Sequence, residues 1–364
     1  MLVGEARQQA RAWVEDEARR VPGFLGAFLT GSTKWKPPDA VHHASSDVDV
    51  RLVVEPGPST DPDASSHAGS PSSRDGVLIE WKKSRHRDIL LEAAAVTRSQ
   101  LGTVEEIVAN PHLAGSLWHP VLLADPAGEL AELGRRVTAQ FTKRSWVDER
   151  RNRTRDLVLL WLETIDQAES FPEQVTCWLF GTGVTTFVLL SAALRNLTVR
   201  RRYAESRALL VEHGRLDFHE EMLQWLGCAD MQPARARQHL DALAAAFDAT
   251  AQHLDPSFRF AADLRPDARA IAIDGSRELI DEGLHREAVF WLLSTFSRCL
   301  QGLRVDAPDP VRALCDAGFR DLLRDLGLET RADLQARADH VRAEMPRLEA
   351  VAQGIIDATP EIVD

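Results

Sequence analysis

The sequence is poor in cysteine and lysine and has no excess of positive charge. Its four cysteines lie far apart, without a Cys-x-x-Cys pair, so neither a zinc site nor a disulfide framework is expected. This cysteine usage predicts a reducing, cytoplasmic location. The net charge of −12 at pH 7 argues against a nucleic-acid partner, because nucleic-acid-binding proteins usually carry a basic surface.

Long apolar runs are also scarce. The N-terminal stretch has no basic segment followed by an apolar one, so we expect an amphipathic helix there and no signal peptide. One stretch, residues 175–194, carries no charge and has about the length of a membrane span. Its first half is rich in Thr and Gly, and an amphipathic segment follows it directly. We therefore predict a buried central helix and no membrane association.

The pattern of apolar residues changes along the chain. Strands are predicted within residues 23–31, 48–55, 76–84 and 116–130. Helices are predicted near residues 4–20 and 85–100, and helical periodicity begins at about residue 128 and continues to the end. Residues 56–75 are rich in Pro, Ser, Gly and Asp, which predicts a mobile surface loop.

These segments predict an α+β protein, with a small mixed-sheet domain followed by an all-α helical-bundle domain. Asp255-Pro256 and the irregular stretch after it predict a break within the helical part. The predicted domains are residues 1–140, which would hold any catalytic site, then 141–255 and 256–364.

Acidic residues inside two of the predicted strands suggest a site. Because successive strand side chains alternate between faces, Asp47 and Asp49 share one face with Arg51. On the strand at 76–84, the same rule places Glu80 and Lys82 together. If the two strands are neighbours, three carboxylates converge, and carboxylate oxygens are the ligands that Mg²⁺ accepts beside phosphate and water.

A Gly-Ser turn precedes these acids in the chain. A glycine after a strand lets the backbone approach a phosphate closely, and Ser32 adds a hydroxyl and an N–H group to Gly31. Lys82 is a candidate phosphate contact because it shares the face of Glu80. Lys34, Lys36 and Lys83 also lie near the predicted site in sequence, and for these a solvated loop charge is an equal alternative.

The segments LTGS (29–32), SDVDV (46–50) and LIEWK (78–82) together resemble the DNA polymerase β-type nucleotidyltransferase superfamily. Its pattern is a Gly-Ser turn, an Asp-x-Asp strand and an acid on a later strand. The layout, with a helical C-terminal half, is similar to that of antibiotic nucleotidyltransferases that modify aminoglycosides or lincosamides. The resemblance in motifs covers about residues 20–130.

This resemblance implies a role for each matching residue. Gly31 and Ser32 would hold the triphosphate, and Asp47 and Asp49 would ligate Mg²⁺, which usually binds as two ions in such sites. Glu80 would either complete the metal site or act as general base on the acceptor hydroxyl. The gap between Ser32 and Asp47 is longer than is usual in the family.

The predicted function is therefore Mg²⁺-dependent transfer of a nucleoside monophosphate, with ATP as the expected donor, to a hydroxyl of a small molecule. An acidic protein suits a small cationic acceptor, such as an aminoglycoside-like antibiotic, bound with help from the helical part. Two alternatives stay open. One is nucleotidyl transfer to RNA 3′ ends or to a protein, and the other is a non-catalytic nucleotide-binding or toxin–antitoxin partner.

Overall fold

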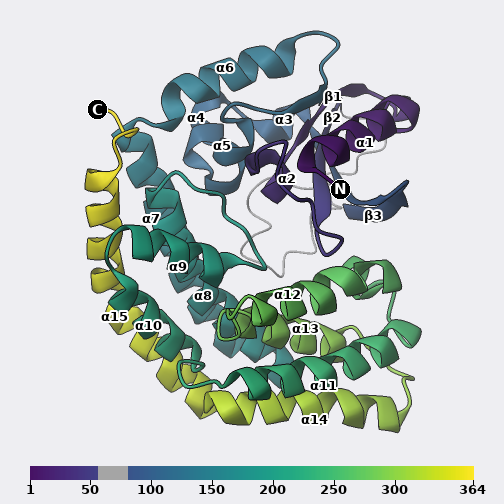
Figure 1. Cartoon of the computed structure of the whole chain (residues 1–364), viewed down its shortest axis with the longest axis vertical. Coiled ribbons are helices and arrows are strands. Elements are labelled where there is room, and N and C mark those ends of the chain that lie inside the picture. Colours follow the sequence, from purple (N-terminus) through teal and green to yellow (C-terminus); the bar gives the residue numbers. More distant parts are fainter. Residues whose placement is uncertain (56–80) are drawn as a thin grey trace. The chain divides into compact units, whose positions relative to one another are not determined.

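The computed structural model describes residues 1–55 and 81–364, with the side chains of residues 81 and 82 left out of the description. The fold is α+β, as predicted. Figure 1 shows strands only in the first part of the chain and helices from α6 (Glu129–Phe141) to the end. The predicted loop 56–75 lies outside the described residues.

The described chain forms two compact units. The first contains Met1–Arg153, Leu194–Leu197 and Ile356–Asp364, and the second contains Thr154–Ala193 and Thr198–Ile355. Two long helices, α7 (Arg144–Glu163) and α15 (Arg331–Ala358), each contribute residues to both units. The division into domains 1–140, 141–255 and 256–364 stays a prediction.

The first unit is built on one five-stranded mixed sheet. Its strands are β1 (Phe24–Leu29), β2 (Asp47–Val54), β3 (Trp81–His86), β4 (Ile89–Thr97) and β5 (Leu122–Ala124). Their order in the sheet is β3-β4-β2-β1-β5. β2 and β4 run parallel, and the other neighbouring pairs are antiparallel. The sheet is therefore mixed, and β2 and β4 lie at adjacent positions within it.

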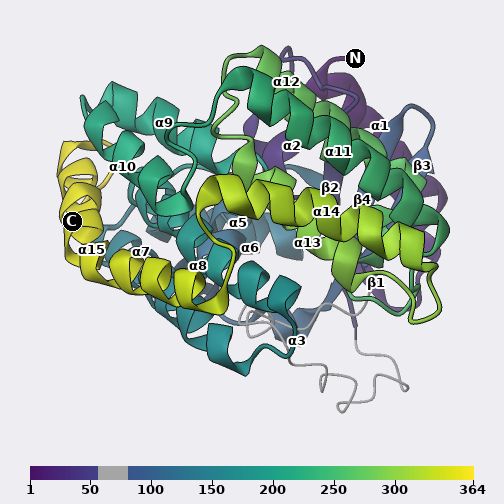
Figure 2. The same cartoon turned by 90° about the horizontal axis from the view of Figure 1, so that it is seen from below.

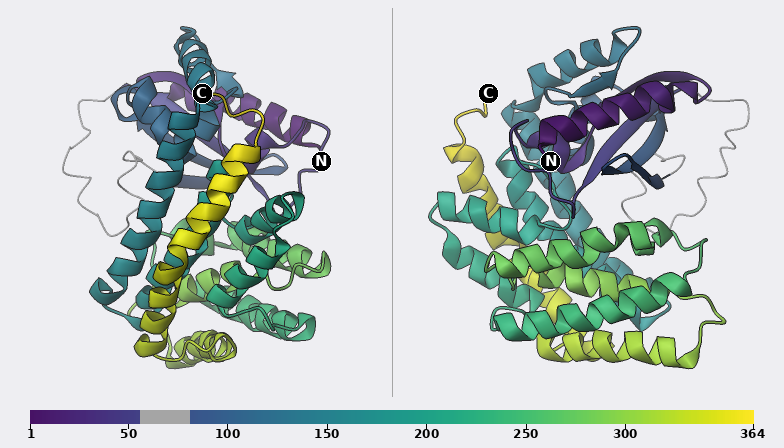
Figure 3. Two further views of the ribbon diagram at one scale, coloured as in Figure 1. Left: turned by 90° about the vertical axis from the view of Figure 1, so that its left-hand side faces the viewer. Right: turned by 45° about the vertical axis from the view of Figure 1, so that its right-hand side comes forward.

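Helices cover both faces of this sheet. α1 (Val3–Asp16) packs its buried residues, among them Ala6, Ala10 and Val14, against Val48 and Val50 of β2. The right-hand view of Figure 3 shows this helix along the sheet. The opposite face is covered by α4 (Val104–Ala109), α5 (Pro111–Leu117) and α6, which form a core with strand residues such as Val53 and Val96. The short helices α2 (Gly31–Trp35) and α3 (Arg98–Leu101) follow β1 and β4.

Residues 85–100, predicted as a helix, instead contain the end of β3, a turn, the whole of β4 and most of the short helix α3. The sequence ILLEAAAVT is rich in residues that favour helices, which explains the wrong prediction. In the structure, β4 pairs with β2 on one side and with β3 on the other, and most of its side chains are buried. Burial and pairing on both sides override a helix propensity of a few tenths of a kcal/mol per residue.

The second unit is entirely helical. Its helices, besides the shared α7 and α15, are α8 (Phe171–Ala192), α9 (Arg202–Glu212), α10 (Leu216–Leu226), α11 (Pro233–Gln252), α12 (Gly275–Asp281), α13 (Val289–Gln301) and α14 (Asp309–Leu326). α11, α13 and α14 pack against one another, as Figure 2 shows. Nearly every residue of α13 is buried, which places this helix in the core of the second unit.

The uncharged stretch at 175–194 lies in α8. This is the helix among the described residues that is long and apolar enough to cross a membrane, and 83% of its most apolar stretch is buried inside the protein. The prediction of a buried central helix is confirmed. Helix α8 is therefore a core element of the second unit, packed against α9 and α13.

Candidate metal centre

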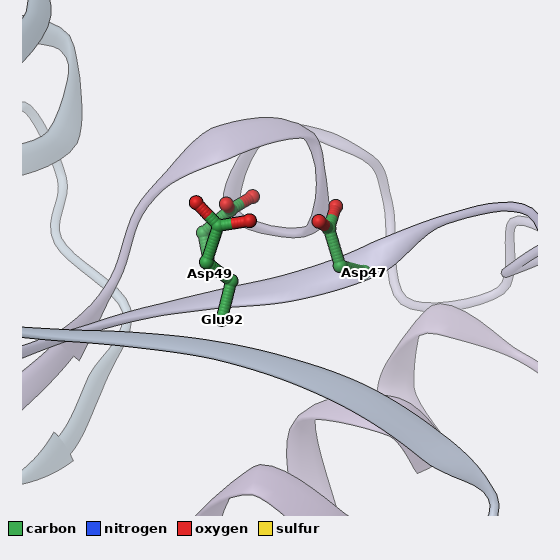
Figure 4. Close-up of side chains that lie close together, drawn as sticks. All are labelled: Asp47, Asp49 and Glu92. Carbon is green, nitrogen blue, oxygen red and sulfur yellow. The ribbon is translucent and has the colours of Figure 1, made fainter. Parts of the chain in front are cut away.

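Three carboxylates meet on the face of the sheet that is covered further along by α4, α5 and α6. Asp47, Asp49 and Glu92 each place one carboxylate oxygen within 4.8 Å of the other two. Figure 4 shows their side chains on the same side of the sheet. The register explains the meeting, because Asp49 on β2 lies directly beside Glu92 on the parallel strand β4. We call these three residues the carboxylate cluster.

The same face becomes apolar toward the ends of the two strands. Along β2, Asp47 and Asp49 are followed at two-residue steps by Arg51 and Val53, and Val53 belongs to the core beneath the covering helices. Along β4, Glu92 is followed on the same face by Val96, which lies in the same core. The cluster thus lies on the part of this sheet face that the apolar core does not cover, on two rigid neighbouring strands.

A lysine lies within the cluster. Lys83 on β3 pairs directly with Glu92 on β4, and its Nζ lies 2.8 Å from Glu92 Oε2 and 3.6 Å from Asp47 Oδ2. Its side chain is only 8% exposed. An ammonium held by two carboxylates in a sheltered place is a cation at the position where a metal ion would bind.

The electrostatics of Asp49 reflect its crowded surroundings. Removal from water and the charge of Asp47 raise the pKa of Asp49 to about 7, although Lys83 and Arg51 act in the opposite direction. Burial lowers the pKa of Arg51 to about 10 despite the nearby charges of Asp49 and Glu92. The two cations therefore offset only part of the cost of burying the Asp49 charge beside Asp47.

The Gly-Ser turn lies directly against Asp49. Gly31 has a φ of +58°, and a Cβ atom at this position would overlap the carboxylate of Asp49. The N–H of Thr30 donates to the carbonyl of Asp49 at 2.9 Å, and the hydroxyl of Thr33 donates to the carbonyl of Asp47 at 3.2 Å. Glycine at position 31 thus satisfies both the left-handed backbone and the close approach to a cluster carboxylate.

Lys34, which follows this turn, is buried and structural. Its Nζ donates to the carbonyl of Gly115 in α5 at 2.8 Å and lies 4.1 Å from the ring centre of Trp35 and 5.4 Å from that of Trp118. Burial lowers the pKa of Lys34 to about 8. The alternative of a solvated loop charge is therefore wrong for Lys34, because the side chain fastens α2 to α5.

The structure brings together four of the six predicted site residues. Gly31, Ser32, Asp47 and Asp49 lie at adjoining ends of β1, α2 and β2. Glu80 lies outside the described residues, so its role stays a prediction. Lys82 lies in β3 opposite Ala93, and the description does not include its side chain.

Sequence reasoning missed Glu92 and Lys83 as members of the site. Glu92 is the one charged residue in the apolar run from Ile89 to Val96, and such an isolated acid was a usable signal. The signal was lost because the run was interpreted as a helix. The sequence places Lys83 only near the site, as one of four lysines, because its contact with Glu92 depends on the β3–β4 pairing.

The cluster suits a divalent cation by the chemistry of its donors. Three carboxylates on rigid strands offer hard oxygen ligands, and the Lys83 ammonium already lies among them as a cation.

A comparison with models of known protein families finds no match, and a comparison with curated protein sequences finds none either. The resemblance to the nucleotidyltransferases thus depends on the motifs and on the site.

Proposed function

We propose that the protein is a Mg²⁺-dependent nucleotidyltransferase that transfers a nucleoside monophosphate, AMP from ATP in the first instance, to a hydroxyl of a small acceptor. The observation that carries this proposal is the convergence of Asp47, Asp49 and Glu92 beside Gly31. The Gly-Ser turn and the Asp-x-Asp strand were predicted from the sequence. The third acid of that pattern finds a match in Glu92, one strand away from Asp49 in register.

The residues would divide the work as follows. Asp47, Asp49 and Glu92 would hold Mg²⁺, which supplies charge neutralisation for the attacking and leaving oxygens at the α-phosphorus. The backbone of Gly31 and Ser32 would receive the triphosphate, since the turn lies directly against the carboxylate of Asp49.

In the proposed reaction, the acceptor oxygen forms a bond to the α-phosphorus while the bond to pyrophosphate breaks. The hydroxyl proton leaves to a general base, for which Glu80 is the predicted residue. The net negative charge of the protein favours a cationic acceptor. A cytoplasmic location, where ATP and Mg²⁺ are available, is part of the same proposal.

The test is pyrophosphate release with each of the four nucleoside triphosphates over a panel of acceptors, with products identified by mass spectrometry. The panel includes aminoglycosides, lincosamides and an RNA 3′ end, so that it separates the acceptor classes. We expect a nucleotidylated small molecule that requires Mg²⁺.

Two variants with the same chemical change control this test. Asp49→Asn should abolish transfer while the protein stays folded, because it removes a cluster carboxylate. Asp39→Asn changes an exposed aspartate and should keep full activity. Equal activity of wild type and Asp49→Asn, or no product from any donor and acceptor, would contradict the proposal.

A further inference from the structure

We infer that Lys83 is an internal competitor of the divalent ion, and that the ion binds only when the Lys83 ammonium leaves the carboxylate cluster. This inference rests on the proposed metal site and adds a residue that controls its occupancy. It concerns Lys83 itself, which the sequence motifs do not include.

The contacts of Lys83 place its charge among the metal ligands. Its Nζ is 2.8 Å from Glu92 Oε2 and 3.6 Å from Asp47 Oδ2, and both oxygens belong to the cluster. Its backbone is fixed by the pairing of β3 with β4, where Lys83 and Glu92 are direct partners. The ammonium is therefore held at the cluster by the register of the sheet and by two carboxylates.

A divalent ion at the cluster and this ammonium are attracted by the same carboxylates. Mg²⁺ lies about 2.0–2.1 Å from its oxygen ligands and requires their lone pairs in a near-octahedral arrangement. The Lys83 ammonium forms ion pairs with Glu92 and Asp47 and repels a second cation at this distance. Binding of the ion by all three carboxylates therefore requires withdrawal of the ammonium, which the flexible four-carbon stem of lysine allows.

The consequence is a difference in affinity between the free ion and the ion bound to a nucleotide. Without nucleotide, the ion must displace a resident cation, so the free metal binds weakly. A metal–triphosphate chelate also brings phosphate oxygens, which offer the displaced ammonium new anionic partners. The cluster would thus bind the chelate in preference to the free ion.

The first experiment measures Mn²⁺ binding without nucleotide by electron paramagnetic resonance. Lys83→Met should bind Mn²⁺ at least ten-fold more tightly than wild type. Arg85→Met is the matched control, because it removes one positive charge from an exposed side chain of the same strand, and it should stay within about two-fold of wild type. Unchanged or weaker binding by Lys83→Met would overturn the inference.

Asp49→Asn separates this inference from the proposed function. If wild-type Mn²⁺ binding depends on Asp49 while Lys83→Met binds like wild type, the metal site stands and only the role of Lys83 fails. If Asp49→Asn leaves Mn²⁺ binding unchanged both in the wild-type protein and in the Lys83→Met variant, the metal site itself fails.

A second experiment uses the wild-type protein, so it does not depend on the folding of a variant. Reductive methylation with formaldehyde and borohydride is followed by mass spectrometry of the lysine-containing peptides, in EDTA and in saturating Mg²⁺. Methylation of Lys83 should rise several-fold with Mg²⁺, because the ammonium leaves its two carboxylates. The buried Lys34, bonded to the Gly115 carbonyl, is the internal control and should not change. Equal methylation of Lys83 in both conditions would overturn the inference.

Discussion

At the scale of single residues, the site depends on which acid stands beside Asp49. Glu92 does so by register, on a strand that is paired on both sides. From the sequence, Glu80 was the predicted third acid of the site, on the strand that precedes Glu92 in the chain. If Glu92 is a metal ligand and Glu80 is the general base, substitutions at the two positions will affect different steps.

We expect Glu92→Gln to weaken Mn²⁺ binding at least about ten-fold and to reduce transfer with it, because one anionic ligand is lost. Glu80→Gln has the same chemical change and should leave Mn²⁺ binding near the wild-type value, while it flattens the acidic limb of the pH–rate profile. Titration with Mn²⁺ and a pH–rate profile measure the two effects. Loss of metal binding in Glu80→Gln but not in Glu92→Gln would reverse the two assignments.

Alternation along β2 made Asp47 and Asp49 predictable from the sequence, since strand residues at two-residue steps share a face. Lys83 and Glu92 were not predictable in the same way. Their contact depends on which strands pair and in which register, and pairing is decided by burial over the whole sheet. Local sequence thus identified the two cluster residues that lie on one strand, Asp47 and Asp49.

At the scale of elements, α2 and its entry turn position the proposed phosphate-binding backbone. Gly31 allows the turn to lie against Asp49. Gly128, which precedes α6, also has a positive φ of +75°, but a Cβ atom there would meet nothing within 4 Å. The two glycines therefore share a backbone requirement and differ in their surroundings.

We expect Gly128→Ala to lower the free energy of unfolding by about 1–2 kcal/mol, the cost of a left-handed alanine, and Gly31→Ala to lower it by at least as much. Only Gly31→Ala should also abolish Mn²⁺ binding and transfer, because its methyl group must move the Asp49 carboxylate. Chemical denaturation and Mn²⁺ titration of both variants measure these effects. Normal metal binding in Gly31→Ala would show that the turn does not shape the cluster.

The attachment of α2 to α5 through Lys34 makes the stability of the first unit depend on pH. Because burial lowers the pKa of Lys34 from 10.5 to about 8, the folded protein holds a disfavoured charge below pH 8. Between pH 8 and 10.5 the folded state has lost this proton while the unfolded chain keeps it, so stability rises with pH in this window.

Relative to Lys34→Met, the wild-type free energy of unfolding should therefore rise by up to about 3 kcal/mol from pH 8 to 10.5. Groups that titrate in both proteins cancel in this difference. Lys143→Met, at a partly exposed lysine, controls for the loss of one positive charge. A difference that stays flat over this pH window would show that Lys34 is not buried as a cation.

Elements with a clear period were predicted from the sequence, and an alanine-rich strand was not. The alternating polar and apolar residues of β2 and the apolar run of β1 predict strands without reference to the neighbouring strands. β4 has three consecutive alanines, which carry no strong preference for a strand, and its conformation follows from its position between β2 and β3.

At the scale of the whole molecule, the first unit is not continuous in sequence. Its C-terminal piece Ile356–Asp364 joins residues from the first half, since the N–H of Val363 donates to Thr142 at 3.0 Å and the N–H of Arg144 donates to Val363 at 2.7 Å. Ile362 in the same piece is buried. Simple division of the chain by periodicity could not predict this, because the contact joins segments more than 200 residues apart.

Removal of residues 359–364 should therefore lower the free energy of unfolding by about 2–4 kcal/mol, from one buried isoleucine and two backbone hydrogen bonds. Asp364→Asn is the control, because its side chain is 97% exposed and its ion pair with Arg144 should contribute little. Urea denaturation of the two variants measures the difference. Wild-type stability of the truncated protein would contradict the assignment of this piece to the first unit.

The most direct test of the central claim is an anomalous difference map from crystals grown with Mn²⁺ and a non-hydrolysable ATP analogue. We predict a peak bound by Asp47, Asp49 and Glu92, triphosphate oxygens beside Gly31 and Ser32, and the Lys83 ammonium withdrawn from Glu92. Crystals that hold the nucleotide and Mn²⁺ away from these carboxylates, or that bind neither at saturating concentrations, would contradict the account.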